Sequence, residues 1–302
     1  MPLVTSKGLV TNALEEHYAV GAFNSVNMES SQAIVGAAMD ERAPLIIQIT
    51  QATLKYTGPD VLAAILRQLV DESGLPIALH LDHGRTFDVV MRFIRLGFTS
   101  VMIDGSLQPD GKTPRTYEEN VEITKKVVEA AHVVGVTVEG EIGIIGTIGE
   151  VAKALTDPDE AARFIGDTGV DMLAVAIGTT HGLYKGTPFI DVDRVKAIHE
   201  KVGIPLVMHG GSFTPDDDIR AAIRAGIAKV NIDTDMRVAF YDAVKGIIQK
   251  MDAEHIEADR KGESRKYDIR EILRPARDAM RARVADRIRL FGASGKAGCS
   301  CP

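Results

Sequence analysis

The stretch Pro76-Ile77-Ala78-Leu79-His80-Leu81-Asp82-His83-Gly84 shows the pattern that the rest of the chain repeats. It begins with a short apolar run and ends in polar side chains and a glycine, which predicts a buried strand that stops at a turn. Side chains alternate between the faces of a strand, so we expect His80 and Asp82 to share a face and His83 to lie just past the pleat. Such a strand end either brings a metal ligand beside an acid–base group or carries structural residues that cap the loop.

Eight apolar runs of this kind alternate with helical segments along the chain. The predicted strands are residues 18–23, 44–50, 76–81, 99–103, 136–142, 172–177, 204–208 and 228–232. Continuous apolar runs are typical of parallel strands that are covered on both faces. Eight strand–helix units therefore predict an α/β fold, a (β/α)₈ TIM barrel.

The C-terminal part of the chain exceeds what a barrel needs. Residues 236–290 form a helical pattern with faces rich in Lys, Arg and Glu, interrupted near Gly262. We expect one domain over residues 1–302, with a C-terminal helical extension at about 251–295 and a disordered tail at 296–302. The extension either contacts another subunit or forms a solvated cap on the barrel.

Composition excludes several classes of protein. The chain has 302 residues and a formal net charge of −7, and it contains no block rich in Lys and Arg, so we expect no nucleic-acid partner. No apolar run has the length of a membrane span and the start does not resemble a signal peptide, which predicts no membrane association. The two cysteines, Cys299 and Cys301, lie in the last four residues and cannot crosslink the core. A cytoplasmic location fits best.

Three histidines follow three different predicted strands. His83, His181 and His209 should therefore meet at the C-terminal rim of the barrel, where active sites of this fold form. Three histidines with carboxylates beside them have the composition of a catalytic zinc site, which leaves one coordination position open. His80 is expected to pack or form hydrogen bonds inside the barrel.

Two glycine-containing or polar segments near the last two strands predict phosphate binding. Gly210-Gly211-Ser212 precedes Pro215, and Asn231 to Thr234 leads into another helix, so both segments place backbone N–H groups near a helix N-terminus. Barrels often bind phosphate after their seventh and eighth strands, and Lys185 would add positive charge. Taken singly, each segment also fits an ordinary tight turn.

The motifs resemble those of the class II, metal-dependent fructose-bisphosphate aldolases and their tagatose-bisphosphate relatives. The similarity extends from Gly21 to Lys296. The motifs that carry it are His80-Leu-Asp-His-Gly84, Ser100-Val-Met-Ile-Asp-Gly105, Val138-Glu-Gly-Glu-Ile-Gly143, Ala176-Ile-Gly-Thr-Thr-His-Gly182, Met208-His-Gly-Gly-Ser212 and Lys229-Val-Asn-Ile-Asp-Thr-Asp235.

The resemblance implies roles for individual residues. His83, His181 and His209 match the zinc ligands, and Asp82 matches the residue that handles the proton of the C4 hydroxyl. Asp104 and Glu141 match ligands of a second, vacated or structural divalent-metal position. Residues on the substrate side are Asn24, Gln48 and Thr50, and those of the dihydroxyacetone-phosphate site, where the family also binds Na⁺ or K⁺, are Gly182, Gly210, Gly211, Ser212, Asn231, Asp233 and Thr234.

Arg270 matches an arginine that reaches the far phosphate from a neighbouring subunit, which implies a homodimer or homotetramer. The loop after the fifth strand departs from the family. It reads Gly143-Ile-Ile-Gly-Thr-Ile-Gly-Glu150 and lacks the Gly-Gly-x-Glu-Asp pattern whose Glu protonates the enediolate. Glu150 is our candidate for this acid.

The resemblance therefore implies a zinc-dependent aldolase that reversibly cleaves a ketose 1,6-bisphosphate, foremost fructose 1,6-bisphosphate, to dihydroxyacetone phosphate and glyceraldehyde 3-phosphate. A tagatose-bisphosphate or other keto-sugar phosphate aldolase of the same family is the alternative. A barrel metallohydrolase would be expected to carry a His-x-His pair after the first strand, where this chain has Phe23-Asn24-Ser25. A non-catalytic barrel is favoured only by the altered loop.

Overall fold

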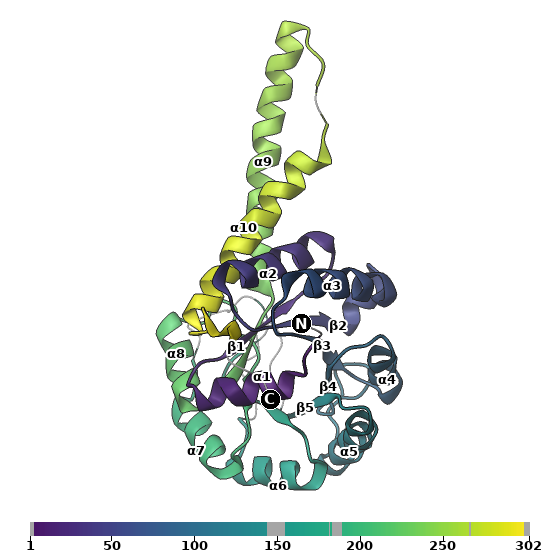
Figure 1. Ribbon diagram of the computed structural model, residues 1–302, viewed down its shortest axis with the longest axis vertical. Helices are drawn as coiled ribbons and strands as arrows, with labels where there is room; N and C mark the ends of the chain where they lie inside the picture. The colour runs from purple at the N-terminus through teal and green to yellow at the C-terminus, as the bar shows by residue number, and fades with distance from the viewer. Residues whose placement is uncertain (1–2, 144–154, 181, 183–188, 266, 299–302) are drawn as a thin grey trace.

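Figure 1 shows the computed structural model, in which eight parallel strands close into a barrel in chain order. The structure describes residues 3–143, 155–180, 182, 189–265 and 267–298. The predicted (β/α)₈ barrel is confirmed. Five residues named in the sequence predictions lie outside the described residues: Glu150, His181, Lys185, Cys299 and Cys301.

The strands agree with the predicted runs to within a few residues, except that β3 continues through His83 and Gly84. Their bounds are β1 (Val20–Asn24), β2 (Leu45–Thr50), β3 (Ile77–Gly84), β4 (Ser100–Ile103), β5 (Thr137–Ile142), β6 (Met172–Val175), β7 (Leu206–Met208) and β8 (Ile227–Ile232). The register pairs Asn24 with Gln48, Gln48 with His80, and Thr50 with Asp82. The polar residues of the first three strands therefore lie side by side near the same end of the barrel.

Helices and two short 3₁₀ segments connect the strands and cover them. Their bounds are α1 (Ser6–Glu15), α2 (Met28–Glu41), η1 (Gln51–Lys55), α3 (Pro59–Ser73), α4 (Phe87–Arg95), α5 (Tyr117–Val133), α6 (Pro158–Thr168), α7 (Val192–Val202), α8 (Asp216–Ala225), α9 (Thr234–Lys261), α10 (Ile269–Leu290) and η2 (Lys296–Gly298). Local signals set many of these ends. Thr116 and Glu119 form a capping box at the start of α5, and Gly169 ends α6 in the left-handed conformation. Among the described residues, no helix is long and apolar enough to cross a membrane.

Helix α1 lies across one end of the barrel (Figure 1). The Ser6 hydroxyl lies 2.6 Å from that of Ser100, and the Lys7 backbone N–H donates to Thr137 Oγ1. Both contacts are made at the N-terminal ends of strands. The opposite mouth, formed by the C-terminal ends of the strands, is therefore the one available to a substrate.

The interior of the barrel contains polar and charged side chains, whereas aliphatic and aromatic side chains fill the layer between strands and helices. Gln48, His80, Glu139 and Lys229 are all fully buried at 0% exposure. A buried charge is tolerated only when it is paired and hydrogen-bonded. The interior is therefore built around specific polar contacts as well as apolar packing.

Helices α9 and α10 form a hairpin that projects away from the barrel (Figure 1). Gly262 ends α9 with a φ of 68°, where the sequence predicted the interruption. Near the barrel, the hairpin is held by Arg287 of α10, whose Nε lies 2.6 Å from Asp235 Oδ2. The hairpin exposes several apolar side chains, namely Tyr241, Ile248, Ile256, Tyr267 and Ile269.

The tail begins in an ordered conformation, which differs from the disorder expected from residue 296. Lys296–Gly298 form η2, and the backbone N–H groups of Gly295 and Ala297 donate to the carbonyls of Glu41 and Arg42. Lys296 also lies 2.6 Å from Glu16. These contacts with the end of α2 and with Glu16 hold the first part of the tail on the barrel.

Candidate active site

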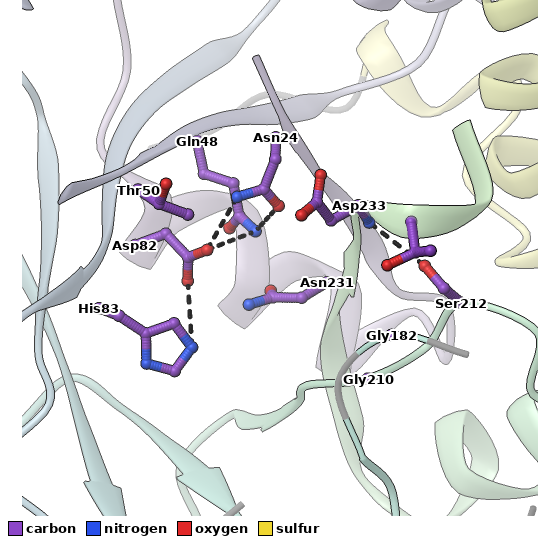
Figure 2. A pocket seen from close by; sticks show the side chains of 11 residues that line it. Asn24, Gln48, Thr50, Asp82, His83, Gly182, Gly210, Ser212, Asn231 and Asp233 are labelled. Atoms are coloured by element: carbon purple, nitrogen blue, oxygen red, sulfur yellow. Dashed lines mark hydrogen bonds and ion pairs between the residues drawn. The ribbon is translucent and has the colours of Figure 1, made fainter. Parts of the chain in front are cut away.

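A pocket opens at the C-terminal mouth of the barrel. Its lining consists of residues that the sequence assigned to catalysis, metal binding or substrate binding: Asn24, Gln48, Thr50, Asp82, His83, Gly182, Gly210, Ser212, Asn231, Asp233 and Thr234. Figure 2 shows these side chains converging from both sides of the pocket. They come from the ends of β1, β2, β3 and β8 and from the segments that follow β6, β7 and β8.

Asp82 is held by amide hydrogen bonds at one oxygen, and its other oxygen faces His83 (Figure 2). Its Oδ2 accepts hydrogen bonds from Asn24 Nδ2 at 2.9 Å and from Gln48 Nε2 at 3.4 Å. Within the described part of the chain, its Oδ1 has no hydrogen-bond partner but lies 3.8 Å from His83 Nε2. Burial opposes ionisation, but the charges of His83, His209 and Lys229 lower the pKa of Asp82 below its ordinary value. Asp82 is therefore a fixed carboxylate with one oxygen able to accept a proton.

His83 leaves the regular pleat of β3. It has a φ of 50°, and the pairing of β3 with β4 shifts register between Leu81 and Gly84. A left-handed residue other than glycine is uncommon and clusters at functional sites. A Cβ on the following Gly84 would lie 2.7 Å from the Met102 carbonyl oxygen, so this close approach of two strands requires glycine. The irregularity explains how adjacent residues, Asp82 and His83, both line the pocket.

The imidazoles of His83 and His209 face each other. His83 Nε2 lies 3.1 Å from His209 Nδ1, and the remaining nitrogen of each ring contacts a buried carboxylate. His83 Nδ1 lies 3.1 Å from Asp104 Oδ2, and His209 Nε2 lies 2.9 Å from Glu139 Oε1. Carboxylates in this position orient metal-bound histidines and raise their basicity.

These contacts fit a metal site. Asp82, His83 and His209 bring one potential ligand atom each within 4.8 Å of one another. Two ring nitrogens that each bind zinc at about 2.0–2.1 Å can lie as close as those of His83 and His209. Burial disfavours the protonated ring, yet the carboxylates of Asp82, Asp104 and Glu141 raise the pKa of His83 to about 10. The surrounding carboxylates therefore favour positive charge at the His83 ring.

Asp104 and Glu141 form a second cluster with His83, again within 4.8 Å. Ser106 Oγ lies 2.7 Å from Asp104 Oδ1 and 3.0 Å from Glu141 Oε1, so its single hydroxyl proton can be donated to either carboxyl group. Burial and the nearby charge of Asp104 raise the pKa of Glu141 to about 8. Burial also opposes the ionisation of Asp104, but contacts with His83 and Arg85 keep its pKa below the usual range. The cluster therefore carries its negative charge mainly on Asp104.

The far side of the pocket is formed by the segments after β7 and β8. Ser212 Oγ accepts hydrogen bonds from the backbone N–H groups of Asp233 and Asp235, at 3.3 and 3.2 Å, and so joins the β7 segment to the start of α9. Gly210 has a φ of 70°, and a Cβ there would clash with the Thr180 carbonyl. Burial raises the pKa of Asp233 to about 6, although Arg237 pairs with it.

The pocket reaches the N-terminus of α9, whereas its lining contains no residue of α8. Both helix starts carry carboxylates, Asp216 to Asp218 in the first turn of α8 and Asp233 and Asp235 at the start of α9, so position relative to the pocket distinguishes them. The sequence predicted phosphate binding at the starts of both helices. Only the start of α9 borders the pocket formed by the described residues, which favours α9 as the phosphate site.

Five described residues of the predicted site are not part of the pocket lining: His209, Asp104 and Glu141, which lie behind His83, and Gly211 and Arg270. The Gly211 backbone N–H donates to the Asn231 carbonyl and so braces the wall. Arg270 lies at the exposed start of α10, where its guanidinium bonds Asp268 of the same chain. A site contribution from Arg270 therefore requires a neighbouring subunit and stays a prediction.

Three residues outside the predicted site support it. Glu139 and Lys229 form a buried pair 2.7 Å apart beneath His209, and Arg85 contacts Asp104. A sequence signal existed for the first two, because Glu139 alternates with Glu141 and Lys229 with Asn231 in strands that are otherwise apolar. Arg85 gave no comparable signal.

Comparisons with known proteins agree with this geometry. The chain matches the family described as "Fructose-bisphosphate aldolase class-II" over residues 4–296. It is 41% identical to a fructose-bisphosphate aldolase of Thermus caldophilus, covering 98% of this chain and 100% of the relative. It is 39% identical to a sulfofructosephosphate aldolase of Alkalicoccus urumqiensis, covering 98% and 99%.

A solved structure gives the same result. The crystal structure of the YdjI aldolase from Escherichia coli K12 matches with a TM-score of 0.81 and 31% identity, over 98% of this chain and 99% of that chain. The sequence resemblance, the barrel and the rim pocket thus agree. The chain belongs to the class II fructose-bisphosphate aldolase family, a family of carbon–carbon lyases.

Proposed function

We propose that the protein is a zinc-dependent aldolase that reversibly cleaves fructose 1,6-bisphosphate to dihydroxyacetone phosphate and glyceraldehyde 3-phosphate. One observation carries the proposal: Asp82, whose Oδ1 accepts no hydrogen bond from the described residues, shares a pocket with His83, whose Nε2 lies 3.1 Å from His209 Nδ1. This arrangement supplies a base beside two metal ligands.

His83 and His209 would hold the zinc ion together with His181, which lies outside the described residues. When bound, zinc would supply Lewis-acid stabilisation of the negative charge that develops on the substrate. The ring nitrogens that do not face each other are fixed by Asp104 and Glu139, so the proposed ligands are oriented before an ion arrives.

Asp82 would act as the base that removes the proton from the C4 hydroxyl. Its Oδ2 is anchored by Asn24 and Gln48, which leaves Oδ1 for the hydroxyl proton. Proton transfer to a positioned carboxylate contributes about 10²- to 10⁴-fold to a rate. Removal of that proton releases the electrons that break the C3–C4 bond, and Glu150 is our candidate for protonating the resulting enediolate.

The dihydroxyacetone-phosphate end would bind at the opposite wall. Gly182, Gly210 and Ser212 face the pocket there, beside Asp233 and Thr234 at the start of α9. A helix N-terminus offers backbone N–H groups and a favourable dipole to a phosphate. Lys185 and the Na⁺ or K⁺ ion expected at this end remain part of the proposal.

The other phosphate would be met by Arg270 of a neighbouring subunit in a homodimer or homotetramer. Arg270 borders a surface groove together with Met28 and Glu29 of α2. The exposed apolar residues of the α9–α10 hairpin favour such an assembly. A cytoplasmic enzyme acting on sugar bisphosphates and triose phosphates is consistent with these features.

A second substrate has specific support. The relative from Alkalicoccus urumqiensis, named a sulfofructosephosphate aldolase, is as similar in identity as the fructose-bisphosphate aldolase of Geobacillus stearothermophilus, both at 39%. The test is to compare kcat/KM for fructose 1,6-bisphosphate, tagatose 1,6-bisphosphate and sulfofructose phosphate. We expect the first value to be highest, and a higher value for either of the others would assign the substrate to that sugar.

A further inference from the structure

Arg85 directly follows β3, and its guanidinium lies against the second carboxylate cluster of the site. Its Nη1 is 3.1 Å from Asp104 Oδ2, the same oxygen that lies 3.1 Å from His83 Nδ1. The other oxygen of Asp104 accepts a hydrogen bond from Ser106. Both oxygens of Asp104, which is 1% exposed, are thus already engaged.

The same cluster has the composition of a divalent-cation site. His83, Asp104 and Glu141 each offer one potential ligand atom within 4.8 Å, and Glu141 Oε2 has no hydrogen-bond partner among the described residues. A divalent ion there would have to share Asp104 with a permanently positive guanidinium. Like charges this close, in a buried setting, repel strongly.

The surroundings hold the arginine in this position. The Arg85 backbone N–H donates to Gln51 Oε1 at 3.4 Å. Its guanidinium also lies against the segment between β4 and α5, because a Cβ placed on Gly111 would come within 3.2 Å of Arg85 Cζ. The Arg85 side chain is only 25% exposed, so it is not a mobile surface group.

We propose that the guanidinium of Arg85 takes the place of a second cation beside Asp104, so that the protein binds one divalent metal ion per chain. Asp104 then serves to orient His83 toward His209 and binds no ion itself. The inference rests on the proposed zinc site, because among the described residues the cluster of Asp82, His83 and His209 is the other group that could hold a metal ion.

The test counts bound ions. Apoprotein is dialysed against Co²⁺ as a zinc substitute, and bound cobalt per chain is measured by mass spectrometry. We expect one ion in the wild type and two in Arg85→Ser, in which Asp104, Glu141 and His83 are released to bind a cation. Arg85→Gln, which keeps most of the side-chain length without the charge, should also bind two and guards against a folding defect in Arg85→Ser.

Two control variants make the count specific. Arg92→Ser on α4 removes an exposed arginine paired with Asp60 and should leave one ion per chain. Arg85→Ser combined with Asp104→Asn should return the count from two to one.

The outcomes separate this inference from the proposed function. Two ions in the wild type, or one in both Arg85 variants, would overturn the inference and leave the aldolase proposal standing. No ion in the wild type but one in the Arg85 variants would contradict the proposed zinc site while supporting exclusion by Arg85. No ion in any of them would overturn both.

Discussion

Glu139 Oε1 lies 2.9 Å from His209 Nε2, and the other oxygen of the same carboxylate lies 2.7 Å from Lys229 Nζ. All three side chains are fully buried. The contact fixes the ring of His209 so that Nδ1 faces His83 Nε2, 3.1 Å away. A charged pair inside the barrel thus determines which nitrogen of a proposed metal ligand is presented.

The first prediction concerns metal affinity. Glu139→Gln keeps the shape of the side chain but removes the charge that raises the basicity of His209, so zinc affinity should fall by about 10- to 100-fold. Competition with a chromophoric chelator measures the dissociation constant. Glu129→Gln, an exposed substitution on α5, is the matched control and should bind as the wild type does. Equal affinity in both variants would refute the orienting role.

The second prediction concerns stability. Glu139→Gln leaves the ammonium of Lys229 buried without its counter-ion, which should lower the free energy of unfolding by about 3–5 kcal/mol. Adding Lys229→Met should recover most of this loss, because the double variant buries no unpaired charge. Urea denaturation of metal-free wild type, Glu139→Gln, Lys229→Met and the double variant gives the coupling free energy between Glu139 and Lys229. Additive losses from the two substitutions would show that the pair is not coupled.

The third prediction concerns the proposed base. Asp82→Asn removes the proposed basic carboxylate, so kcat for fructose 1,6-bisphosphate should fall by about 10²- to 10⁴-fold. Zinc content, measured in parallel, should remain near that of the wild type. Asp110→Asn, on the exposed segment after β4, should leave kcat unchanged. Near-normal turnover by zinc-loaded Asp82→Asn would assign the base elsewhere.

The fourth prediction concerns pH. Burial raises the pKa of Asp233 from 3.8 to about 6, so the protein binds this proton more tightly when folded. The resulting stability is fully present below about pH 3.8 and is lost as the pH rises through about 6. The side chain of Asp233→Asn cannot ionise. The melting temperature of the variant minus that of the wild type, both metal-free, should therefore be larger at pH 8 than at pH 4.5. A difference that does not change with pH, or that has the opposite sign, would contradict the buried-carboxylate account.

Much of the fold was predictable because its signals are local. Each strand is a short apolar run, and the polar residues that end β1, β2 and β3 follow directly in sequence. The adjacency of Asp82 and His83 was visible too. The sequence did not reveal the register shift within β3 or the left-handed φ of His83. These two features turn both Asp82 and His83 toward the pocket.

The supporting contacts were not predictable in the same way. Glu139 and Lys229 are 90 residues apart, and only the closed barrel brings them together. In the sequence, Arg85 is an ordinary loop arginine. Its contact with Asp104 forms only because β3 and β4 are neighbouring strands in the barrel. The choice of α9 over α8 at the pocket likewise depends on the segment after β7, which bends at Gly210 and attaches Ser212 to the start of α9.

We propose that His83 and His209 hold a metal ion on which cleavage depends. The most direct measurement is the rate of fructose 1,6-bisphosphate cleavage after treatment with EDTA and after adding back Zn²⁺. We expect EDTA to abolish cleavage and stoichiometric zinc to restore it. Full activity in EDTA, together with inactivation by borohydride in the presence of substrate, would instead indicate a Schiff-base lysine and contradict the account.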